Sequence, residues 1–597
     1  MKKFIASIFC ILLVFTITAN EQTPAEKPAD DGKKKEEVQW KFYTKNRSYM
    51  YLDYKAKEGS PEDSFGALTT ENFAESKYTN YSFGLRKTFT VFARKNYDPA
   101  LFDHDYQYSN ELFNHSWEQW VDRIYFKGQW KPVEFTVGDF YESMNRGMAF
   151  SMKNDPIYGD NSIRGGNVTV DFKGFQLKAF GGRANPQMRD KATFQRMQET
   201  DDWLAGFEGG WKWKKAGFGV QYGYGNYGKY RLSRSNEEDA SIKSWVYSEK
   251  EFHFTGAYIE LKNPFPGFSY YAGAVYVPYA YENTILQDSF FGEIQPETVE
   301  KTDLDNASAF YSSALYFFDF GQKKSRLTFK VEGKMYSKYF LNYTRMEDSD
   351  YKRRYFNPPT LLPMDLQIDN EFDTWAVGGR ISLNDRHLTK AKYNIDFVKG
   401  DSLDNTDAVP AYNSAVAGNF AYQKEDFWYI GGSGEKDFGQ ISFSANVGYH
   451  SATGNFNEDE VNPDKSTTDN RQWLIAGLHL SGFVSKFSVK FTNDYYLKNM
   501  ELAGNQEFDN AHELKTVLDV SWDRKYFFTV KNTFWHNNNP GDRSGNWYTG
   551  GSIGFKYDTI RLYLFGGLEK GGLTCDGGMC RFLPDFKGVK AELDISL

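Results

Sequence analysis

Apolar and polar residues alternate along most of this sequence, and this period of two limits the fold more than any other feature. In residues 327–335, apolar residues or glycine fill the odd positions, while Thr, Lys and Glu fill the even positions. Residues 391–397, 443–449 and 487–492 repeat the same split. Successive side chains of a strand point to opposite faces. Each segment therefore predicts a β-strand with one apolar face and one polar or ionic face.

The alternating segments come in pairs joined by short polar turns, and longer loops rich in Asp, Asn, Gly and Tyr separate the pairs. A soluble β-sandwich also alternates, but tight turns at one end and long loops at the other are typical of a transmembrane β-barrel. Backbone groups that face lipid must all be paired, and only a closed sheet leaves no edge. We therefore predict an all-β fold, a large antiparallel transmembrane β-barrel over residues 38–597. Eleven hairpins are expected, at residues 78–95, 121–139, 167–183, 202–224, 252–276, 308–336, 374–397, 425–450, 472–497, 514–535 and 546–568.

The number of strands follows from these hairpins and from the two ends of the barrel. A first strand is expected near residues 39–56 and a last strand near residues 589–596. The total is about 24 strands, within a range of about 22–26, because closure favours an even number. Barrels of about 16–18 strands already enclose an aqueous channel, so this wall predicts a wide lumen.

The beginning of the chain predicts export. Lys2 and Lys3 precede an apolar run over residues 4–17, and this pattern is typical of a signal peptide over residues 1–19. Residues 20–37 have almost no apolar content and predict a disordered periplasmic leader. We therefore expect the protein in the outer membrane of a Gram-negative cell. Its expected partners are outer-membrane lipid, the barrel assembly machinery and a surface or periplasmic protein.

The composition favours a surface rich in displayed rings and argues against a nucleic-acid partner. Aromatic residues make up 18% of the chain and stand singly between charged residues instead of in apolar runs. This spacing is unusual for rings buried in a soluble core. The net charge is -8 and the sequence shows no basic patch, so nucleic acid is not an expected partner.

Two motif regions resemble one known family. They are VGDFYESMNRGMAF with GDNSIRGGNVTVDF, and the C-terminal CDGGMCRFLPDFKG. Both resemble an outer-membrane β-barrel family of Bacteroidota and related Gram-negative phyla, which has no assigned biochemical function. The resemblance implies a location and a fold, but no reaction. The matching residues are Gly138, Asp139, Phe140, Tyr141, Glu142, Arg146, Gly147, Asp160, Asn161, Ser162, Arg164 and Gly165, then Cys575, Gly577, Gly578, Cys580, Arg581, Pro584, Phe586 and Gly588.

The end of the chain departs from such barrels, which commonly finish in an aromatic residue that the assembly machinery recognises. This chain finishes in Leu597, although Ala591, Leu593 and Ile595 form an outward apolar row with it. A last strand is still expected there, with a weaker recognition signal.

Cys575 and Cys580 are the only cysteines outside the signal peptide, and we expect them to form a disulfide. Gly577 and Gly578 lie between them and allow the chain to turn back on itself. The loop before the last strand of a barrel that starts in the periplasm is extracellular. The disulfide is therefore expected on the outer face, where it would fix this loop.

Four charged residues of the first motif region, Asp139, Glu142, Arg146 and Arg164, form a candidate charge cluster. If the loop between them folds inward, opposed carboxylates and guanidiniums could line a constriction, because charge rings set selectivity in pores. The other interpretation is a set of structural salt bridges that fix the loop to the wall. We favour this second interpretation, because buried charges are normally paired.

We expect the lumen to be obstructed, because wide barrels are commonly plugged and no separate plug domain precedes the first strand. The filling is expected from residues 142–166, held by Arg146 and Arg164, and from the tyrosine-rich residues 339–370. The predicted function is a loop-obstructed channel or transport component, or a scaffold for a surface complex.

A lipase-like or protease-like hydrolase is the alternative function. His479 and Ser481 share one strand face, with Lys490 on a neighbouring strand, but residues two apart on a strand lie about 7 Å apart. His450 and Ser451 are adjacent and therefore point to opposite faces. The chain has no GxSxG or HExxH motif. We therefore assign no catalytic residues and expect no enzyme activity.

The loop over residues 455–470 is the candidate cation site. It contains five carboxylates but no EF-hand spacing, so a solvated loop is the first interpretation and a Ca²⁺ site is the alternative. No cofactor is expected elsewhere. The carboxylates are those of Glu458, Asp459, Glu460, Asp464 and Asp469.

Overall fold

The computed structural model describes the barrel and several segments inside or above it. The predicted signal peptide and leader, residues 1–37, lie outside the described residues. Residues Gln39–Leu597 form one compact unit. The described residues are 38–51, 65–94, 121–152, 154–155, 159–186, 202–236, 242–290, 293–294, 298–303, 306–337, 345–346, 353–354, 359, 361, 374–403, 423–457, 466–502, 505–538, 546–570, 572–576, 579–583 and 586–596.

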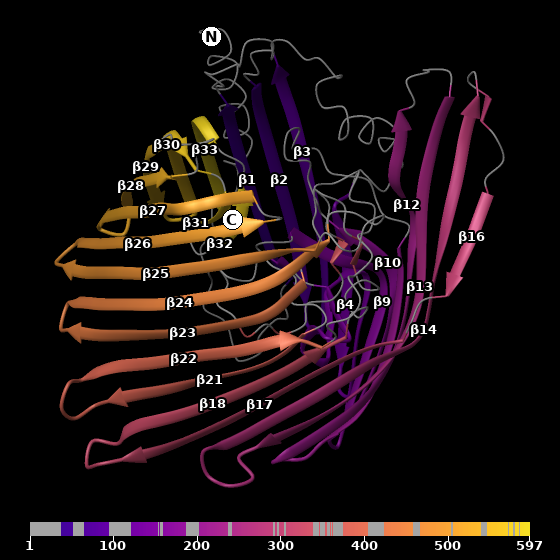
Figure 1. Cartoon of the computed structure of the whole chain (residues 1–597), viewed down its shortest axis with the longest axis horizontal. Helices are drawn as coiled ribbons and strands as arrows, with labels where there is room; N and C mark the ends of the chain where they lie inside the picture. Colours follow the sequence, from indigo (N-terminus) through magenta and orange to yellow (C-terminus); the bar gives the residue numbers. More distant parts are fainter. Residues whose placement is uncertain are drawn as a thin grey trace, which may run out of the picture. The chain divides into compact units, whose positions relative to one another are not determined.

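A closed, fully antiparallel wall of 24 strands confirms the predicted barrel (Figure 1). The first strand pairs with the last from Tyr43 opposite Ser596 to Tyr51 opposite Gly588, so the sheet has no free edge. The wall strands are β1 (Gln39–Tyr51), β2 (Phe65–Tyr78), β3 (Tyr81–Arg94), β4 (Arg123–Trp130), β5 (Val133–Phe140), β9 (Gly159–Phe172), β10 (Phe175–Pro186), β11 (Trp203–Lys212), β12 (Ala216–Asn236), β13 (Ile242–Lys262), β14 (Phe268–Phe290), β17 (Ala307–Phe320), β18 (Ser325–Tyr336), β21 (Thr374–Asp385), β22 (Ala391–Ser402), β23 (Gln423–Phe438), β24 (Ile441–Asn457), β25 (Ser466–Val484), β26 (Phe487–Leu502), β27 (Asn505–Trp522), β28 (Tyr526–His536), β29 (Asn546–Tyr557), β30 (Ile560–Glu569) and β33 (Phe586–Ser596).

The remaining described elements are short. Three of them, β8, β15 and β16, pair with wall strands, and the others form small separate hairpins. They are β6 (Glu142–Met144), the 3-10 helix η3 (Asn145–Gly147), β7 (Phe150–Met152), β8 (Asn154–Asp155), β15 (Glu293–Ile294), β16 (Thr298–Asp303), β19 (Arg345–Met346), β20 (Arg353–Arg354), β31 (Gly572–Asp576) and β32 (Met579–Leu583).

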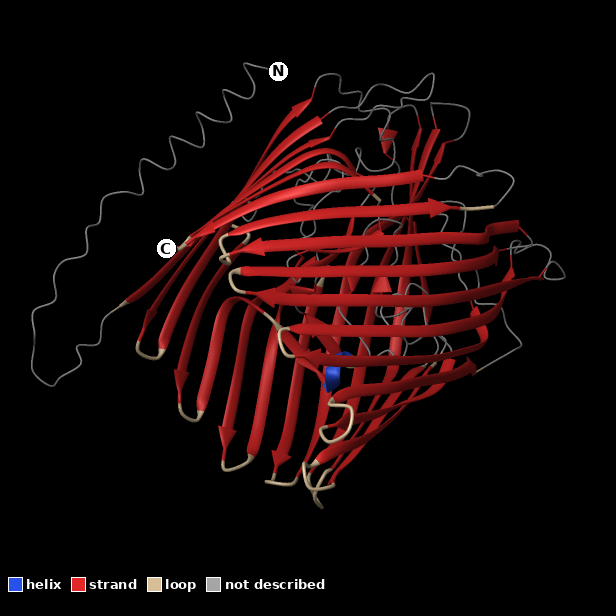
Figure 2. Cartoon of the chain, turned by 90° about the vertical axis from the view of Figure 1, so that its left-hand side faces the viewer, coloured by secondary structure: helices blue, strands red, loops and turns tan. Residues whose placement is uncertain are grey.

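Ten of the eleven predicted hairpins exist where they were expected, and the tight turns lie along one rim of the barrel (Figure 2). The predicted bounds of the first hairpin are wrong, because residues 78–95 hold only one strand, β3, and its partner β2 begins at Phe65. The outward face of β2 carries Thr70, Asn72 and Ser76 beside Ala74 and Tyr78. The apolar period on which the prediction depended is therefore interrupted in this strand.

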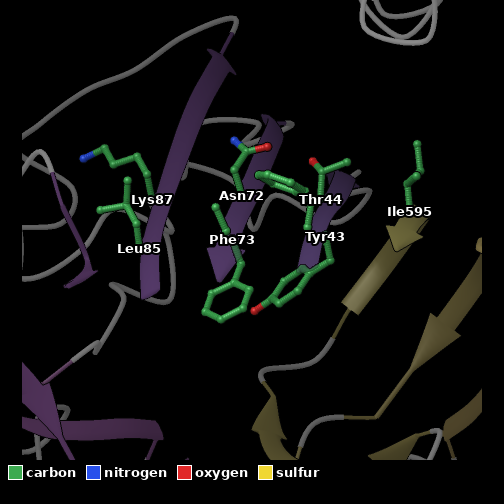
Figure 3. Close-up of a pocket in the computed structure, with 9 residues that line it drawn as sticks. Tyr43, Thr44, Asn72, Phe73, Leu85, Lys87 and Ile595 are labelled. Atoms are coloured by element: carbon green, nitrogen blue, oxygen red, sulfur yellow. The ribbon is translucent and has the colours of Figure 1, made fainter. Parts of the chain in front are cut away.

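The closing seam shows how successive side chains separate into two faces. Thr44, Asn72 and Ile595 lie on one side of the wall, and Tyr43 and Phe73 lie on the other (Figure 3). On the inner side the two rings stack with their centroids 4.9 Å apart. The Tyr43 hydroxyl donates a hydrogen bond to a Glu71 carboxylate oxygen, 2.9 Å away. The lumen side is thus polar and internally paired.

The outer face is apolar, as the alternation predicts. Val331, Ile395, Val447 and Ile553 are each more than half exposed, although all four are large apolar side chains. Such a surface is stable only against lipid. No helix among the described residues is long and apolar enough to cross a membrane.

Exposed rings border this apolar band at both ends, as expected where a membrane meets water. At the far ends of their strands stand Trp203, Trp375, Trp428 and Trp547. The ring residues beside the tight turns are Trp130, Phe172, Phe175, Trp211, Trp213, Phe265, Phe320, Phe438, Trp522, Tyr526 and Tyr557.

A lysine on the outer face is expected to impair the barrel much more than a lysine on the inner face. Val447 lies midway along β24 and is 55% exposed to the lipid side. Val447→Lys should therefore destabilise the folded protein in lipid by about 2–4 kcal/mol. Ser444→Lys, on the inner face of the same strand, is the control and should cost little. Equal stability of the two variants in urea-dependent folding into vesicles would contradict this assignment of faces.

Candidate functional site

The chain between β5 and β9 folds into the lumen instead of out over the rim. Its described part is the hairpin β6–η3–β7, with η3 drawn in blue in Figure 2. Met144, Met148, Phe150 and Met152 of this inward hairpin are at most 1% exposed. Apolar burial of this kind holds the hairpin against the inner wall.

The inner wall provides an apolar seat for the inward hairpin. Buried residues from nine wall strands, β5, β9 to β14, β17 and β18, form one core cluster with it. The inner face of a water-filled barrel is ordinarily polar, so apolar residues at inward positions indicate that something covers them. The wall residues include Phe180, Leu204, Tyr227, Phe252, Phe254, Tyr271 and Val275.

The tip of the inward hairpin is locked into the wall by Asn145. The Asn145 amide nitrogen donates to the carbonyl oxygens of Ala274, at 3.1 Å, and Ala257, at 3.5 Å, on two neighbouring strands. Its amide oxygen accepts a hydrogen bond from the Tyr271 hydroxyl at 2.5 Å. Gly273 provides the space, because a Cβ there would lie 2.1 Å from Asn145 Oδ1.

Arg146 follows in a left-handed conformation with a φ of 54°, which turns its side chain toward the lumen. Its guanidinium carbon lies 3.7 Å from the centre of the Tyr271 ring, and Nη2 is 4.0 Å from Glu260 Oε1. The side chain is 44% exposed. Arg146 therefore covers the Tyr271 ring and still presents a positive charge to the lumen.

The candidate charge cluster does not form one constriction. Arg164 pairs with Asp139 across two wall strands at 3.1 Å, and Glu142 pairs with Lys178 of β10 at 2.8 Å. Arg146 pairs separately with Glu260. The four residues thus belong to three separate ion pairs, which agrees with the structural interpretation.

The bounds predicted for the inward segment need a correction. Residues 142–166 were expected to fill the lumen, but β9 begins at Gly159 and pairs with both β5 and β10. Arg164 is therefore a wall residue. Sequence reasoning also missed Asn145 and Gly273, for which the glycine after Asn145-Arg146 was the only local signal.

The second predicted filling segment, residues 339–370, lies mostly outside the described residues. Six of its residues are described: four form the short strands β19 and β20, and the other two, Pro359 and Leu361, lie against the inner wall. The Tyr336 hydroxyl donates to the Pro359 carbonyl oxygen at 2.6 Å. Leu361 packs against the core cluster that holds the inward hairpin and also against a second buried cluster, which includes Val398, Phe427 and Trp473. At these two positions the segment is thus inside the barrel.

The elements of the hydrolase alternative lie on the inner wall of β25 and β26. His479 Nε2 is 2.9 Å from Asp494 Oδ1, so a carboxylate does orient the histidine. Ser481 faces Lys490 in the register of the two strands. No hydrogen bond joins Ser481 to His479 in the described part of the lumen. A serine nucleophile needs such a bond to its base, and hydrolase activity stays an untested alternative.

Two other sequence predictions fall partly outside the described residues. The centre of the candidate Ca²⁺ loop, residues 458–465, is not described, and the described side chains hold no metal-binding group of His, Cys, Asp and Glu. The strands β31 and β32 place Cys575 directly opposite Cys580. The side chains of this pair are not described, so the disulfide stays a prediction.

The fold and the lumen define a class: this is a transmembrane β-barrel of the outer-membrane type. Residues 442–597 match a family described as "Family of unknown function (DUF6029)". The match covers less than half of the chain and carries no activity with it. No curated protein matches the chain in sequence.

The chain is also similar to solved outer-membrane transporters. The unliganded ferric citrate transporter FecA has 9% identity and a TM-score of 0.44, over 93% of this chain and 78% of that one. The transporter YddB from Escherichia coli has 7% identity and a TM-score of 0.43, over 93% and 81%. The copper transporter OprC has 9% identity and a TM-score of 0.42, over 95% and 81%. Likeness at this level says nothing about a solute.

Proposed function

We propose that the protein is an outer-membrane transport component whose lumen is kept closed by its own chain. One observation carries the proposal, which is the burial of Met144, Met148 and Phe150 against an apolar seat on the inner wall. A barrel of this width would otherwise enclose an open aqueous channel. The Asn145 hydrogen bonds also fix the position of the hairpin tip on the wall.

The proposal includes the way the protein reaches and sits in the membrane. Residues 1–19 direct export as a signal peptide, and the long loops face the outside of the cell. The Cys575–Cys580 disulfide closes the hairpin before the last strand. Its support is the register of β31 and β32, because directly opposite residues of antiparallel strands have Cβ atoms about 4.5–5.5 Å apart.

Purified full-length protein is expected to conduct ions poorly in planar lipid bilayers. The reason is that the inward hairpin occupies lumen that water would otherwise fill. Heat-dependent migration on a gel should show, in the same preparation, that the barrel is folded. Large and steady single-channel currents from the intact protein would refute the proposal and make it an open porin.

A further inference from the structure

Three lysines surround one buried carboxylate on the inner wall of β26 and β27. The Glu513 side chain is 4% exposed. Lys498 Nζ lies 2.8 Å from one of its oxygens, and Lys570 and Lys515 lie 3.0 and 3.4 Å from the other. We call these four residues the Glu513 site. It combines three positive charges with one negative charge.

Aromatic rings line the Glu513 site. Lys570 Nζ is 3.5 Å from the centre of the Trp535 ring. Lys515 Nζ is 4.9 Å from the Tyr496 ring, and Lys498 Nζ is 5.1 Å from the Trp473 ring. These rings hold the ammonium groups through cation–π contacts without neutralising them. Tyr496 and Trp473 are buried, whereas Trp535 is partly exposed and offers a flat apolar surface next to the charges.

The positive excess continues along the same wall. Glu569, at the end of β30, pairs with Lys531 of β28 at 3.4 Å and with Lys590 of β33. Here again two lysines share one carboxylate. Around Glu513 and Glu569, lysines therefore outnumber the carboxylates that they are described to contact.

Wall stability alone does not require this arrangement. Some ion pairs of the inner wall join one lysine to one carboxylate, as Lys392 does with Glu435 at 3.2 Å. Crowded ammonium groups repel one another, most strongly where water is scarce. Burial lowers the pKa of Lys570 to about 8, and the charges of Lys498 and Lys515 add to this effect while Glu513 opposes it. An incoming anion would relieve that repulsion.

We propose that the Glu513 site binds an anionic solute that carries a carboxylate or a phosphate beside a ring. The ammonium groups of Lys515 and Lys570 bind the anion, and the partly exposed Trp535 ring packs against the solute. Charge-assisted hydrogen bonds of this kind are about twice as strong as neutral ones. This inference deepens the proposed function, because it names a class of solute for the lumen.

Calorimetric titration of the full-length protein in detergent tests the site with glucose 6-phosphate, glucuronate and glucose. Both anions, or one of them, should bind, and glucose should not. Lys515→Gln and Lys570→Gln should each weaken binding about tenfold, since each removes one charge-assisted hydrogen bond. Lys392→Gln is the control, because this lysine belongs to a one-to-one pair, and it should leave binding unchanged.

The outcome also identifies the anion. Binding of glucose 6-phosphate alone assigns a phosphate site, and binding of glucuronate alone assigns a carboxylate site. Failure of both anions to bind, or equal weakening by Lys392→Gln, would overturn the inference. Binding is measured on closed protein, so this failure is distinct from a failure of the proposed function, which conductance decides.

Anion affinity is expected to fall as the pH rises through about 8, because Lys570 then loses its proton and its charge. The groups that face Lys570 are Glu513 and Lys515 on β27, Lys498 on β26 and the Trp535 ring on β28. Lys570→Arg keeps a permanent charge and should flatten this pH profile. An unchanged profile in this variant would refute the role given to Lys570.

Discussion

Removing residues 143–155 and joining the ends with a short Gly-Ser linker is expected to turn a closed barrel into an open channel. Single-channel conductance in planar bilayers should rise by about an order of magnitude or more, because a wall of this width encloses far more space than inward side chains fill. The deletion stops before Gly159, where β9 begins, so the paired wall is kept. Wall residues of the apolar seat then face water, and the folded barrel should also be less stable.

Point variants test the same release without shortening the chain. Gly273→Val places a side chain where Asn145 now sits, since a Cβ at Gly273 would lie 2.1 Å from Asn145 Oδ1. Asn145→Ala removes the hydrogen bonds of the tip. Both should produce intermittent openings, because the apolar contacts of the hairpin remain. Gly566→Val is the matched control, since no heavy atom lies within 4 Å of its Cβ position.

Folded variants that stay closed would contradict the role of the inward hairpin. Heat-dependent gel migration separates this result from simple misfolding of the barrel. If the deletion leaves conductance unchanged while the barrel is folded, the obstruction is not the inward hairpin. A deletion within residues 339–370 would then be the next experiment, because Pro359 and Leu361 of that segment also lie inside the barrel.

The wall could be predicted from the sequence because its signal is local. Outward positions need apolar residues and inward positions tolerate polar ones, so the period of two appears within each strand. The one strand that was missed, β2, has polar residues such as Asn72 on its outward face. Counting hairpins still gave the right number of strands, because β2 was missed while the single strand β3 was counted as two strands.

The contents of the lumen could be predicted only in outline. A wide barrel without a plug domain predicts inward loops, and one motif with charged residues and glycine marked the right segment. The position where Asn145 binds the wall could not be predicted, because it depends on the register of β13 and β14 far along the chain. The Glu513 site is similar, since Lys498, Lys515 and Lys570 meet only through the pairing of separate strands.

Replacing Arg164 with methionine is expected to be among the most destabilising single changes in the wall. The Asp139 side chain is fully buried and pairs with Arg164 at 3.1 Å. Arg164 Nη2 also donates to the carbonyl oxygens of Val121 and Asp122, just before β4. Arg164→Met removes the positive charge beside the buried Asp139 carboxylate. Breaking a buried ion pair in this way costs about 3–5 kcal/mol.

The double variant Asp139→Asn/Arg164→Met removes both charges. It therefore separates the energy of the ion pair from the cost of burying the Asp139 charge after Arg164 is removed. Removing both charges should recover a large part of the stability, because no ionised group is then buried without its partner. The neutral side chain at position 139 can still accept the hydrogen bond that the Ile124 backbone N–H now donates to Asp139 at 2.8 Å. The free energy of unfolding, measured by urea-dependent folding into vesicles, gives the coupling between the two residues. If the single and double variants were equally unstable, the loss would come from the Val121 and Asp122 contacts of Arg164, and the pair itself would contribute nothing.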